Sequence, residues 1–367
     1  MKIAILSPIC WRTPPRHYGP WEQVASNIAE GLLRKGYDVT LFATKDSVTS
    51  GKLDSICPHP YEEDKRLDPK VWECLHIGHL MERAADFDII HNNYDFLPLS
   101  YSRLISTPMV TTIHGFSSPK ILPAFKKYND IVSYVSISNA DRSPELDYVA
   151  TVYNGIEIEH FTFNETPGSY LLYFGRIHYD KGTVEAIQIA KRAGMPLIIS
   201  GIIQDESYYN ERVLPLIDNE QIVYIGSSEP EKRNKLLGEA FALLHPINFE
   251  EPFGLSVAES MMCGTPVITF NRGSMPELVE HGKTGFLVHS VEEAADRVGD
   301  ISTIDRAYCR EWSISRFSSE RMIEGYIDVY HRVLERAHSS SRFGHHSRIS
   351  KLASEVSKLA GETGWVL

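Results

Sequence analysis

The feature that most constrains this fold is the alternation of short apolar runs with segments of helical period. Residues 2–7 (KIAILS) form an apolar run of strand length, residues 21–36 carry a helical pattern that ends at Gly36, and residues 38–43 (DVTLFA) are apolar again. Near-continuous apolar runs are typical of strands in a parallel sheet that helices cover on both faces. The sequence therefore predicts an α/β fold built on parallel sheets.

The alternation continues in two blocks, which a stretch without periodicity separates. In the first block we expect further strands at residues 87–92, 108–114, 131–138 and 148–154. In the second block we expect strands at residues 170–175, 196–201, 222–226, 241–246 and 266–270, and helices that include residues 180–193 and 229–240. Residues 157–169 contain Pro167 and Gly168, and we interpret them as the linker between the blocks.

Two Rossmann-like domains follow from this pattern, since 367 residues are enough for two hydrophobic cores. We expect the first domain at residues 1–163 and the second at residues 164–316, with a helix at about residues 317–335 that packs back on the first domain. Residues 339–367 are rich in Ser, His and basic side chains. Their apolar pattern leaves two interpretations open, a disordered tail or a helix that packs or supports a homo-oligomer; its positions are Ile349, Leu352, Val356 and Leu359.

Charge and cysteine content exclude several classes of protein. The net charge of −11 and the isoelectric point near 5.8 argue against broad electrostatic binding to nucleic acid. The five cysteines show no CxxC spacing, which indicates buried thiols in a reducing compartment rather than a disulfide framework or a zinc site. The first ten residues contain too short an apolar run for a signal peptide, and no stretch reaches the length of a membrane span. We therefore expect a soluble, cytoplasmic protein with neither a nucleic-acid partner nor an integral membrane segment.

Two such domains would face each other across a cleft at the carboxyl ends of their strands, where ligands bind in open α/β sheets. The segment 173–182 (YFGRIHYDKG) supplies two cations to that cleft. A strand ends at Gly175, Arg176 follows it, and Lys181 lies at the start of the next helix. Two cations beside a helix amino terminus suit a diphosphate. On this motif alone, an exposed Arg and Lys beside a turn is an equally good interpretation.

A second motif places acidic residues on both sides of a Pro-Phe-Gly turn. In residues 249–254 (FEEPFG), Glu251 precedes a helix that should begin near Leu255, and Glu259 lies about one turn inside that helix. Carboxylates accept hydrogen bonds from the vicinal hydroxyls of a ribose or a hexose, and the first backbone N–H groups of a helix are unpaired. The alternative is a helix with a favourable acidic first turn and no ligand.

Together the two motifs resemble those of the family 4 glycosyltransferases. Three further segments match in consistent order, namely TTIHG (111–115), MCGTPVI (262–268) and GSMPELVEHGKTGFLV (273–288), and the similarity extends from residue 1 to about residue 335. The resemblance implies the GT-B fold, in which two Rossmann-like domains face a central cleft. It also implies a retaining hexosyltransferase. Such an enzyme moves a hexose from a nucleotide-diphosphate sugar, of the UDP-glucose or GDP-mannose type, to a sugar or other hydroxyl acceptor.

The resemblance assigns roles to individual residues. It implies that Arg176 and Lys181 bind and neutralise the donor diphosphate, while Glu259 holds the ribose hydroxyls. It also implies that Glu251 contacts the donor sugar close to the reacting carbon. The other donor-side residues that it implies are Gly175, Phe253, Gly254, Leu255 and, from the N-terminal domain, His114, for which a structural role is the alternative. The implied front-face mechanism uses no metal ion and no cofactor beyond the nucleotide-sugar co-substrate.

The glycine-rich loop after the first strand departs from the usual pattern of the family. Residues 13–24 read TPPRHYGPWEQV, with Gly19 followed by Pro20 where the family commonly has a Gly-Gly pair. Proline removes an N–H that could bind phosphate, and it suits the first position of a helix. The candidates for acceptor contacts in this loop are Arg16, His17, Tyr18, Gly19, Trp21 and Glu22.

Other functions stay open at the level of sequence. A nucleotide-sugar hydrolase or epimerase would share the donor site, and a non-catalytic nucleotide-sugar-binding scaffold would keep the fold without turnover. A dehydrogenase is disfavoured, because no GxGxxG follows the first strand. The triplet Asp86–Asp88 (DFD) has the form of a metal-binding DxD, but acidic residues also mark the solvated start of a strand. Because Arg176 and Lys181 can neutralise the diphosphate, no metal is required.

Overall fold

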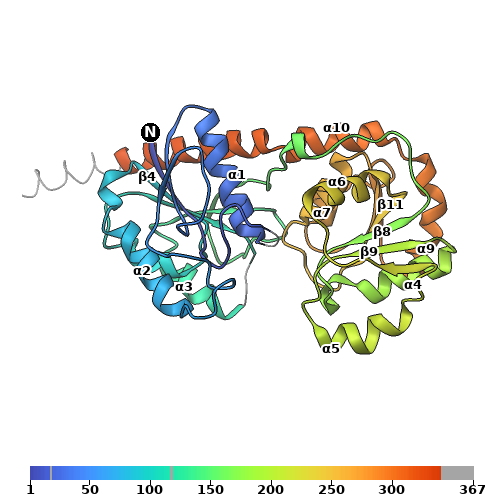
Figure 1. The fold of residues 1–367 in the computed structure, drawn as a ribbon. Helices are drawn as coiled ribbons and strands as arrows, with labels where there is room; N and C mark the ends of the chain where they lie inside the picture. The colour runs from blue at the N-terminus through green and yellow to red at the C-terminus, as the bar shows by residue number, and fades with distance from the viewer. Residues whose placement is uncertain (17–18, 116–118, 340–367) are drawn as a thin grey trace, which may run out of the picture.

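The first lobe is built on a parallel sheet with the strand order β3-β2-β1-β4-β5-β6-β7. The structure is a computed structural model that describes residues 1–16, 19–115 and 119–339 (Figure 1). The strands are β1 (Lys2–Leu6), β2 (Asp38–Phe42), β3 (Lys52–Asp54), β4 (Ile89–Asn92), β5 (Met109–Ile113), β6 (Ser133–Ser136) and β7 (Tyr148–Thr151). The helices are α1 (Pro20–Arg34), α2 (Pro69–Met81) and α3 (Leu122–Lys127), with 3-10 turns η1 (Ala84–Asp86), η2 (Leu97–Tyr101), η3 (Pro119–Ile121) and η4 (Ile158–His160).

Both faces of this sheet are buried, as the near-continuous apolar runs predict. On β1, Ile3 and Ile5 join one apolar cluster, while Ala4 and Leu6 join another on the opposite face. Helix α1 covers the first of these faces, because its apolar residues recur at the helical period and are buried. The helix has Pro20 at its first position, where a missing N–H costs nothing.

The second lobe is built on a parallel sheet with the order β10-β9-β8-β11-β12-β13. Its strands are β8 (Leu171–Phe174), β9 (Leu197–Ser200), β10 (Ile222–Tyr224), β11 (Ala242–His245), β12 (Val267–Phe270) and β13 (Gly285–Val288). Its α-helices are α4 (Thr183–Ala193), α5 (Glu206–Tyr208), α6 (Pro230–Glu239), α7 (Leu255–Met262), α8 (Met275–Leu278), α9 (Val291–Val298) and α10 (Arg306–Phe317). Its other helical turns are η5 (Tyr179–Lys181), η6 (Tyr209–Val213), η7 (Leu214–Leu216) and η8 (Gly299–Thr303).

The predicted α/β fold with two parallel, Rossmann-like sheets is confirmed, and each strand expected from an apolar run is present. Two strands were missing from the prediction. The edge strand β3 has three residues, none of them buried, so it carries no apolar run. Strand β13 is only four residues long and begins with Gly285, whose φ of +159° marks an extended backbone beside β12.

The last described helix, residues 319–339, belongs in space to the first lobe. Figure 1 shows that the chain leaves α10 in the second lobe and crosses to the first, where this helix runs beside α1. Tyr326 and Tyr330 are fully buried in the same cluster as Ile3 and Ile5. The Tyr330 hydroxyl lies 2.7 Å from Nδ1 of His91. The helix therefore completes the core of a lobe whose sheet ends more than 150 residues earlier.

The predicted tail falls almost wholly outside the described residues, which end at residue 339. Within the described ranges, no helix combines the length and the apolar character that crossing a membrane requires.

Candidate active site

The carboxyl end of β8 presents the first predicted cation. The strand ends at Phe174, and two residues later the guanidinium of Arg176 donates a hydrogen bond to Oε1 of Gln204. The Tyr173 hydroxyl donates to the carbonyl oxygen of Arg176 over 2.8 Å, which fixes the backbone of this turn. Arg176 thus lies at the strand end, as predicted, and the partner that the structure gives its side chain is a neutral amide.

Lys181, the second predicted cation, lies in the helical turn η5 that follows β8. It is the last residue of η5, and only Gly182 separates it from α4. The following Gly182 has a φ of +71°, and a methyl group placed on it would lie 1.8 Å from the carbonyl oxygen of Pro246. Only glycine therefore lets this turn pack against the loop that follows β11.

That loop supplies the carboxylate that pairs with Lys181. Glu251 is 8% exposed and forms an ion pair with Lys181, and Nε2 of His245 lies 3.5 Å from the same carboxylate. Burial alone would raise the pKa of Glu251, but the charge of Lys181 and the nearby His245 ring outweigh burial and lower this pKa to about 2. Glu251 is therefore ionised at neutral pH and holds the ammonium of Lys181 in place.

One turn into α7, Glu259 pairs with a cation that the sequence analysis missed. Its carboxylate is 8% exposed and lies 3.4 Å from the guanidinium of Arg233 on α6. Burial raises the pKa of Glu259, although the charge of Arg233 opposes this shift. Helix α6 reads PEKRNKLLGE, and its spacing does not separate Arg233 from the neighbouring lysines. Only the packing of α6 against α7 reveals the pair.

Helix α7 begins at Leu255, as predicted, and its amino end is open. Gly254 precedes it in the left-handed region with a φ of +90°, and no side chain caps the helix, so its first N–H groups point beyond the amino end. Ser274 fixes the preceding loop from the GSMPE segment. Its backbone N–H donates to the carbonyl of Glu251 over 2.9 Å, and its hydroxyl donates to the carbonyl of Phe253 over 2.7 Å.

The first lobe contributes His114, which directly follows β5. The ring is 8% exposed, and its Nε2 lies 3.0 Å from the side-chain oxygen of Asn93. Burial lowers the pKa of His114 to about 3, so the ring is neutral at physiological pH. Trp21 stacks on the ring with 5.6 Å between the ring centres and an interplanar angle of 28°. The structure thus brings together two predicted residues that lie 93 positions apart in the sequence.

The two lobes meet beside His114. Gly115 has a φ of +110°, and a methyl group placed on it would lie 2.8 Å from Cγ of Pro252. Pro252 directly follows Glu251, so this close approach sets His114 opposite the loop that carries the buried carboxylate. The two motifs named from sequence, TTIHG and FEEPFG, therefore face each other where the lobes meet and form the two walls of the candidate site.

Glu277 of α8 holds this arrangement with hydrogen bonds across the lobes. Its carboxylate accepts hydrogen bonds from the backbone N–H of Asn139 over 2.9 Å, from Nδ2 of Asn139 over 3.0 Å and from the backbone N–H of Ala140 over 2.8 Å. The hydroxyl of Tyr153 donates to it over 2.9 Å. Glu277 lies within the GSMPELVEHG segment that suggested the family resemblance, but the sequence analysis gave it no role.

The loop before α1 packs on a buried acid. Gly19 has a φ of +150°, and a methyl group placed on it would lie 3.0 Å from Oε2 of Glu22. Glu22 is 3% exposed and accepts a hydrogen bond from the backbone N–H of Trp11 over 3.0 Å. Because burial outweighs these hydrogen bonds, the pKa of Glu22 is raised to about 7. Gly19 is thus needed for close packing, and Glu22 holds the loop through its hydrogen bond from Trp11.

The remaining candidates of this loop lie elsewhere or are not described. Arg16 pairs with Asp46 over 2.9 Å and with Glu63, both on its own lobe. His17 and Tyr18 lie outside the described residues.

The DFD triplet lies at the amino end of β4, opposite the sheet edge that carries His114. Asp86 pairs with Arg83 over 3.2 Å, and Asp88 accepts a hydrogen bond from the backbone N–H of Lys2 over 2.7 Å. Within the described ranges, His, Cys, Asp and Glu side chains nowhere gather in a group of three that could hold a metal ion. Asp86 and Asp88 are thus both engaged in contacts at the start of the strand.

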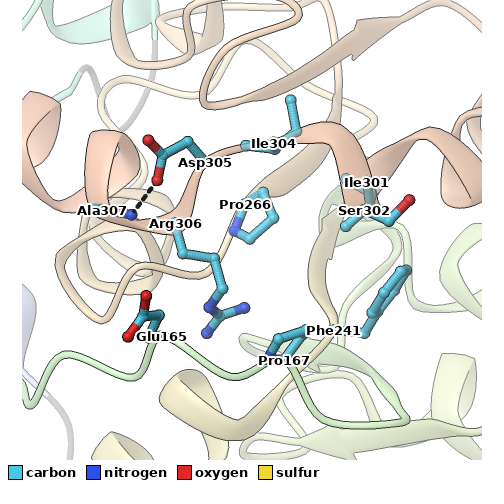
Figure 2. Close-up of a pocket in the computed structure, with 10 residues that line it drawn as sticks. All are labelled: Glu165, Pro167, Phe241, Pro266, Ile301, Ser302, Ile304, Asp305, Arg306 and Ala307. Carbon is cyan, nitrogen blue, oxygen red and sulfur yellow. Dashed lines mark hydrogen bonds between the residues drawn. The ribbon is translucent and has the colours of Figure 1, made fainter.

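A separate hollow lies beside the connection between the lobes. Figure 2 shows the guanidinium of Arg306 there, between Glu165 and Pro167. It donates to the carbonyl oxygens of Asn164 and Gly238, each over 2.7 Å. Arg306 thus ties the predicted linker to the end of α6, and none of the candidate site residues described above lines the hollow.

Comparison with known families decides the class of this protein. The family "Glycosyltransferase Family 4" matches residues 21–160, and "Glycosyl transferases group 1" matches residues 156–315. The two matches together run through both lobes. The chain belongs to the family 4 glycosyltransferases. The predicted family and enzyme class are therefore confirmed.

Similar proteins include several glycosyltransferases. The chain is 25% identical over 343 residues to the glycogen synthase of Mycobacterium tuberculosis, covering 78% of this chain and 81% of the relative. It is 25% identical over 370 residues to the GDP-mannose:cellobiosyl-diphosphopolyprenol alpha-mannosyltransferase of Xanthomonas oryzae pv. oryzae, covering 86% of this chain and 94% of the relative.

Solved structures support the GT-B fold. The sucrose-phosphate synthase of Thermosynechococcus elongatus superposes with a TM-score of 0.73 at 17% identity, covering 92% of this chain and 100% of that chain. The Anabaena HepE protein in complex with UDP and glucose gives a TM-score of 0.68 at 19% identity, covering 90% of this chain and 99% of that chain. At these identities the likeness concerns the fold alone.

Proposed function

We propose that this glycosyltransferase moves a hexose from a nucleotide-diphosphate sugar to a hydroxyl acceptor, with retention at the anomeric carbon and without a metal ion. The observation that carries the proposal is the Lys181–Glu251 ion pair beside the open amino end of α7, opposite His114. Cations, backbone N–H groups and a carboxylate at one place match the diphosphate and the hydroxyls of such a donor.

Each residue has a distinct task in this proposal. Arg176 and Lys181 bind the diphosphate, and Glu259 accepts hydrogen bonds from the ribose hydroxyls. Glu251 keeps Lys181 in position and accepts a hydrogen bond from the donor sugar, while the neutral His114 contacts that sugar from the other lobe. Because these groups are already placed before the donor binds, little reorganisation is needed during the reaction.

The chemical step is proposed as a front-face substitution. The bond between the anomeric carbon and the diphosphate oxygen breaks, and its electron pair goes to that oxygen. The acceptor oxygen forms the new bond on the same face, and its proton passes to the departing phosphate oxygen. Arg176 and Lys181 stabilise the negative charge that develops on the diphosphate. This stabilisation is their main contribution to lowering the activation barrier.

Names of similar proteins support the donor class. One relative is named for GDP-mannose, and the HepE protein was crystallised with UDP and with UDP-glucose. A nucleotide-diphosphate hexose of either type fits the proposed site, since Glu259 would hold the ribose that both share. We further propose that the enzyme works in the cytoplasm, since all five cysteines are free thiols.

The test is release of free nucleotide from a panel of UDP-, GDP- and ADP-hexoses, in EDTA, with and without mixed sugar acceptors. We expect release from one donor that rises when an acceptor is added, and an anomeric configuration in the product that matches the donor. Equal release without any acceptor would identify a hydrolase instead. Binding of a donor without release would identify a non-catalytic scaffold, and a requirement for added metal would overturn the metal-independent mechanism.

A further inference from the structure

Four unpaired polar atoms line one edge of the first sheet. They belong to residues that follow the carboxyl ends of four adjacent strands, β4 to β7, and are Nδ2 of Asn93, Nδ1 of His114, Oδ2 of Asp141 and Oδ1 of Asn154. Each atom is buried and has no hydrogen-bond partner among the described residues. Buried polar atoms in native proteins are nearly always paired. Seven other unpaired atoms are spread over both lobes, but these four gather at the kind of sheet edge where ligands bind in α/β folds, so they indicate groups that await a polar ligand.

Asp141 is the one acid of this group, and the loop that carries it is held firmly. Its backbone N–H donates to the hydroxyl of Ser138 over 3.1 Å. The two residues before it, Asn139 and Ala140, are bound by Glu277 of the other lobe. The backbone that carries the carboxyl group is therefore held by contacts between the two lobes.

The carboxyl group lies where the two lobes meet. A methyl group placed on Gly115 would lie 3.9 Å from Oδ1 of Asp141 and 2.8 Å from Cγ of Pro252. Gly115 directly follows His114, and Pro252 directly follows Glu251. Asp141 is thus beside the proposed donor-sugar position, on the wall of the first lobe.

The charged and titratable neighbours of Asp141 all have other partners. Arg142 donates from Nε to the hydroxyl of Ser136 over 3.0 Å and lies over the ring of Tyr148. Glu277, which binds the two residues before Asp141, is negative, and the hydroxyl of Tyr148 accepts a hydrogen bond from the backbone N–H of Ser143 over 3.0 Å. Because no described cation compensates it, burial raises the pKa of Asp141 to about 7. Maintaining such an acid costs folding stability, which is common at functional sites.

We propose that Asp141 is an acceptor-binding residue, whose carboxylate accepts a hydrogen bond from a hydroxyl of a sugar or polyol acceptor. This inference rests on the proposed function, because it assumes that an acceptor enters between His114 and the FEEPFG loop. The unpaired Nδ2 of Asn93 can donate to an acceptor oxygen beside it, so the wall offers both a donor and an acceptor of hydrogen bonds. Asp141 therefore sets which hydroxyl faces the donor sugar.

The experiment compares Asp141→Asn with wild type and with the control Asp147→Asn. Asp147 is an exposed acid on the same connection between β6 and β7, and accepts a hydrogen bond from Asn129 over 2.8 Å. Binding of methyl α- and β-hexosides and of glycerol is measured by ligand-observed NMR in the presence of UDP. Transfer to the member that binds best is then followed to obtain KM for acceptor and donor.

We expect Asp141→Asn to raise the acceptor KM about tenfold or more, as for loss of a hydrogen bond to a charged group, while the donor KM and the UDP dissociation constant change less than twofold. The control should match wild type in all three. Unchanged acceptor binding in Asp141→Asn, or no binding of any panel member to wild type, would overturn the proposal.

Melting temperatures at pH 5 and pH 8 separate this role from a structural one. In wild type the folded pKa of Asp141 is raised, so ionisation destabilises the fold as pH rises toward 7, whereas the Asn side chain does not ionise. We expect the melting temperature of Asp141→Asn relative to wild type to increase from pH 5 to pH 8. A variant that is less stable at both pH values would show a structural role and overturn the proposal. Failure of the proposed function alone would appear as binding that depends on Asp141 without any transfer.

Discussion

The two walls of the candidate site, one from each lobe, differ in whether their buried acids are paired with cations. On the second lobe, the buried carboxylates are paired with cations, Glu251 with Lys181 and Glu259 with Arg233. On the first lobe, His114 is neutral and Asp141 has no cation. The second wall therefore has its buried acids paired before any ligand arrives, although Nε2 of His245 and Nε of Arg233 have no hydrogen-bond partner there, whereas the first wall leaves its buried acid unpaired as well.

This difference matches what each half of a glycosyl transfer needs. A diphosphate carries charge, so its site must hold cations against their mutual repulsion, and carboxylates next to them do so. An acceptor hydroxyl is neutral, and unpaired donors and acceptors of hydrogen bonds recognise it at a smaller electrostatic cost. Variants on the two walls should therefore differ in which substrate they affect.

The largest effect is expected from Lys181→Ala on the wall of the second lobe, which we call the paired wall because its buried acids are paired with cations. The variant removes a cation from the proposed diphosphate site and leaves the buried Glu251 without its strongest partner. We expect kcat for hexosyl transfer to fall by ~10²–10³, as for loss of one preorganised donor of transition-state stabilisation. Lys235→Ala is the control, because this lysine is exposed on α6. Turnover within threefold of wild type in Lys181→Ala would exclude the residue from the mechanism.

The next effect concerns an acid of the first lobe, Glu22, which is buried without a cation. Its folded pKa is raised from an ordinary 4.5 to about 7, so wild type loses stability as pH rises through that window. Glu22→Gln has no such penalty and keeps an oxygen for the N–H of Trp11. Relative to wild type, we expect Glu22→Gln to gain up to ~3 kcal/mol of unfolding free energy between pH 4.5 and pH 8.

Urea denaturation of both proteins at several pH values measures this gain. A difference between the two proteins that stays constant with pH would mean that Glu22 does not titrate in this window. Glu30→Gln serves as the control on the same helix, since Glu30 accepts hydrogen bonds from Thr49 and Ser50 near the surface.

On the paired wall, Arg233→Ala should weaken nucleotide binding. Without that cation the pKa of Glu259 should rise further, so that the carboxylate binds the ribose hydroxyls less well. We expect the dissociation constant of the nucleotide to increase about tenfold, which corresponds to ~1.4 kcal/mol. Isothermal titration of UDP and GDP measures it, with Arg192→Ala as the control because Arg192 pairs with Glu292 at the surface. If affinity is unchanged, the Arg233–Glu259 pair only stabilises the fold.

These residues also show how far the sequence predicts the site. Arg176, Lys181, Glu251 and Glu259 lie in short strand-loop-helix segments, and local rules place them correctly at strand ends and at the start of α7. Arg233 could not be predicted, since its role depends on α6 packing beside α7. The fold follows the same division: strands with apolar runs were predicted, whereas the exposed β3 was not.

Residues that act across the lobes were the hardest to predict. Glu277 is separated from its partner Asn139 by 138 positions, and no local pattern links the two. Asp141 lies in a loop without a motif. Only the burial of its carboxyl group and the close approach of Gly115 indicate a role for it. Sequence motifs therefore placed charged candidates on the second lobe and His114 and Trp21 on the first, whereas Arg233, Glu277 and Asp141 take their positions by tertiary contact and carried no local signal.

The smallest effect is expected from an aromatic contact of the first wall, between Trp21 and His114. Trp21 stacks on His114 and so limits the positions of a ring that has a single described hydrogen bond, to Asn93. Aromatic stacking contributes ~0.5–1.5 kcal/mol, so Trp21→Ala should lower kcat/KM roughly twofold to tenfold. Trp21→Phe keeps an aromatic face and should recover most of this loss, while nucleotide affinity stays unchanged in both variants. Equal activity of Trp21→Ala and wild type would mean that Asn93 alone orients His114. A loss of nucleotide affinity in either variant would instead show that the two walls are not independent.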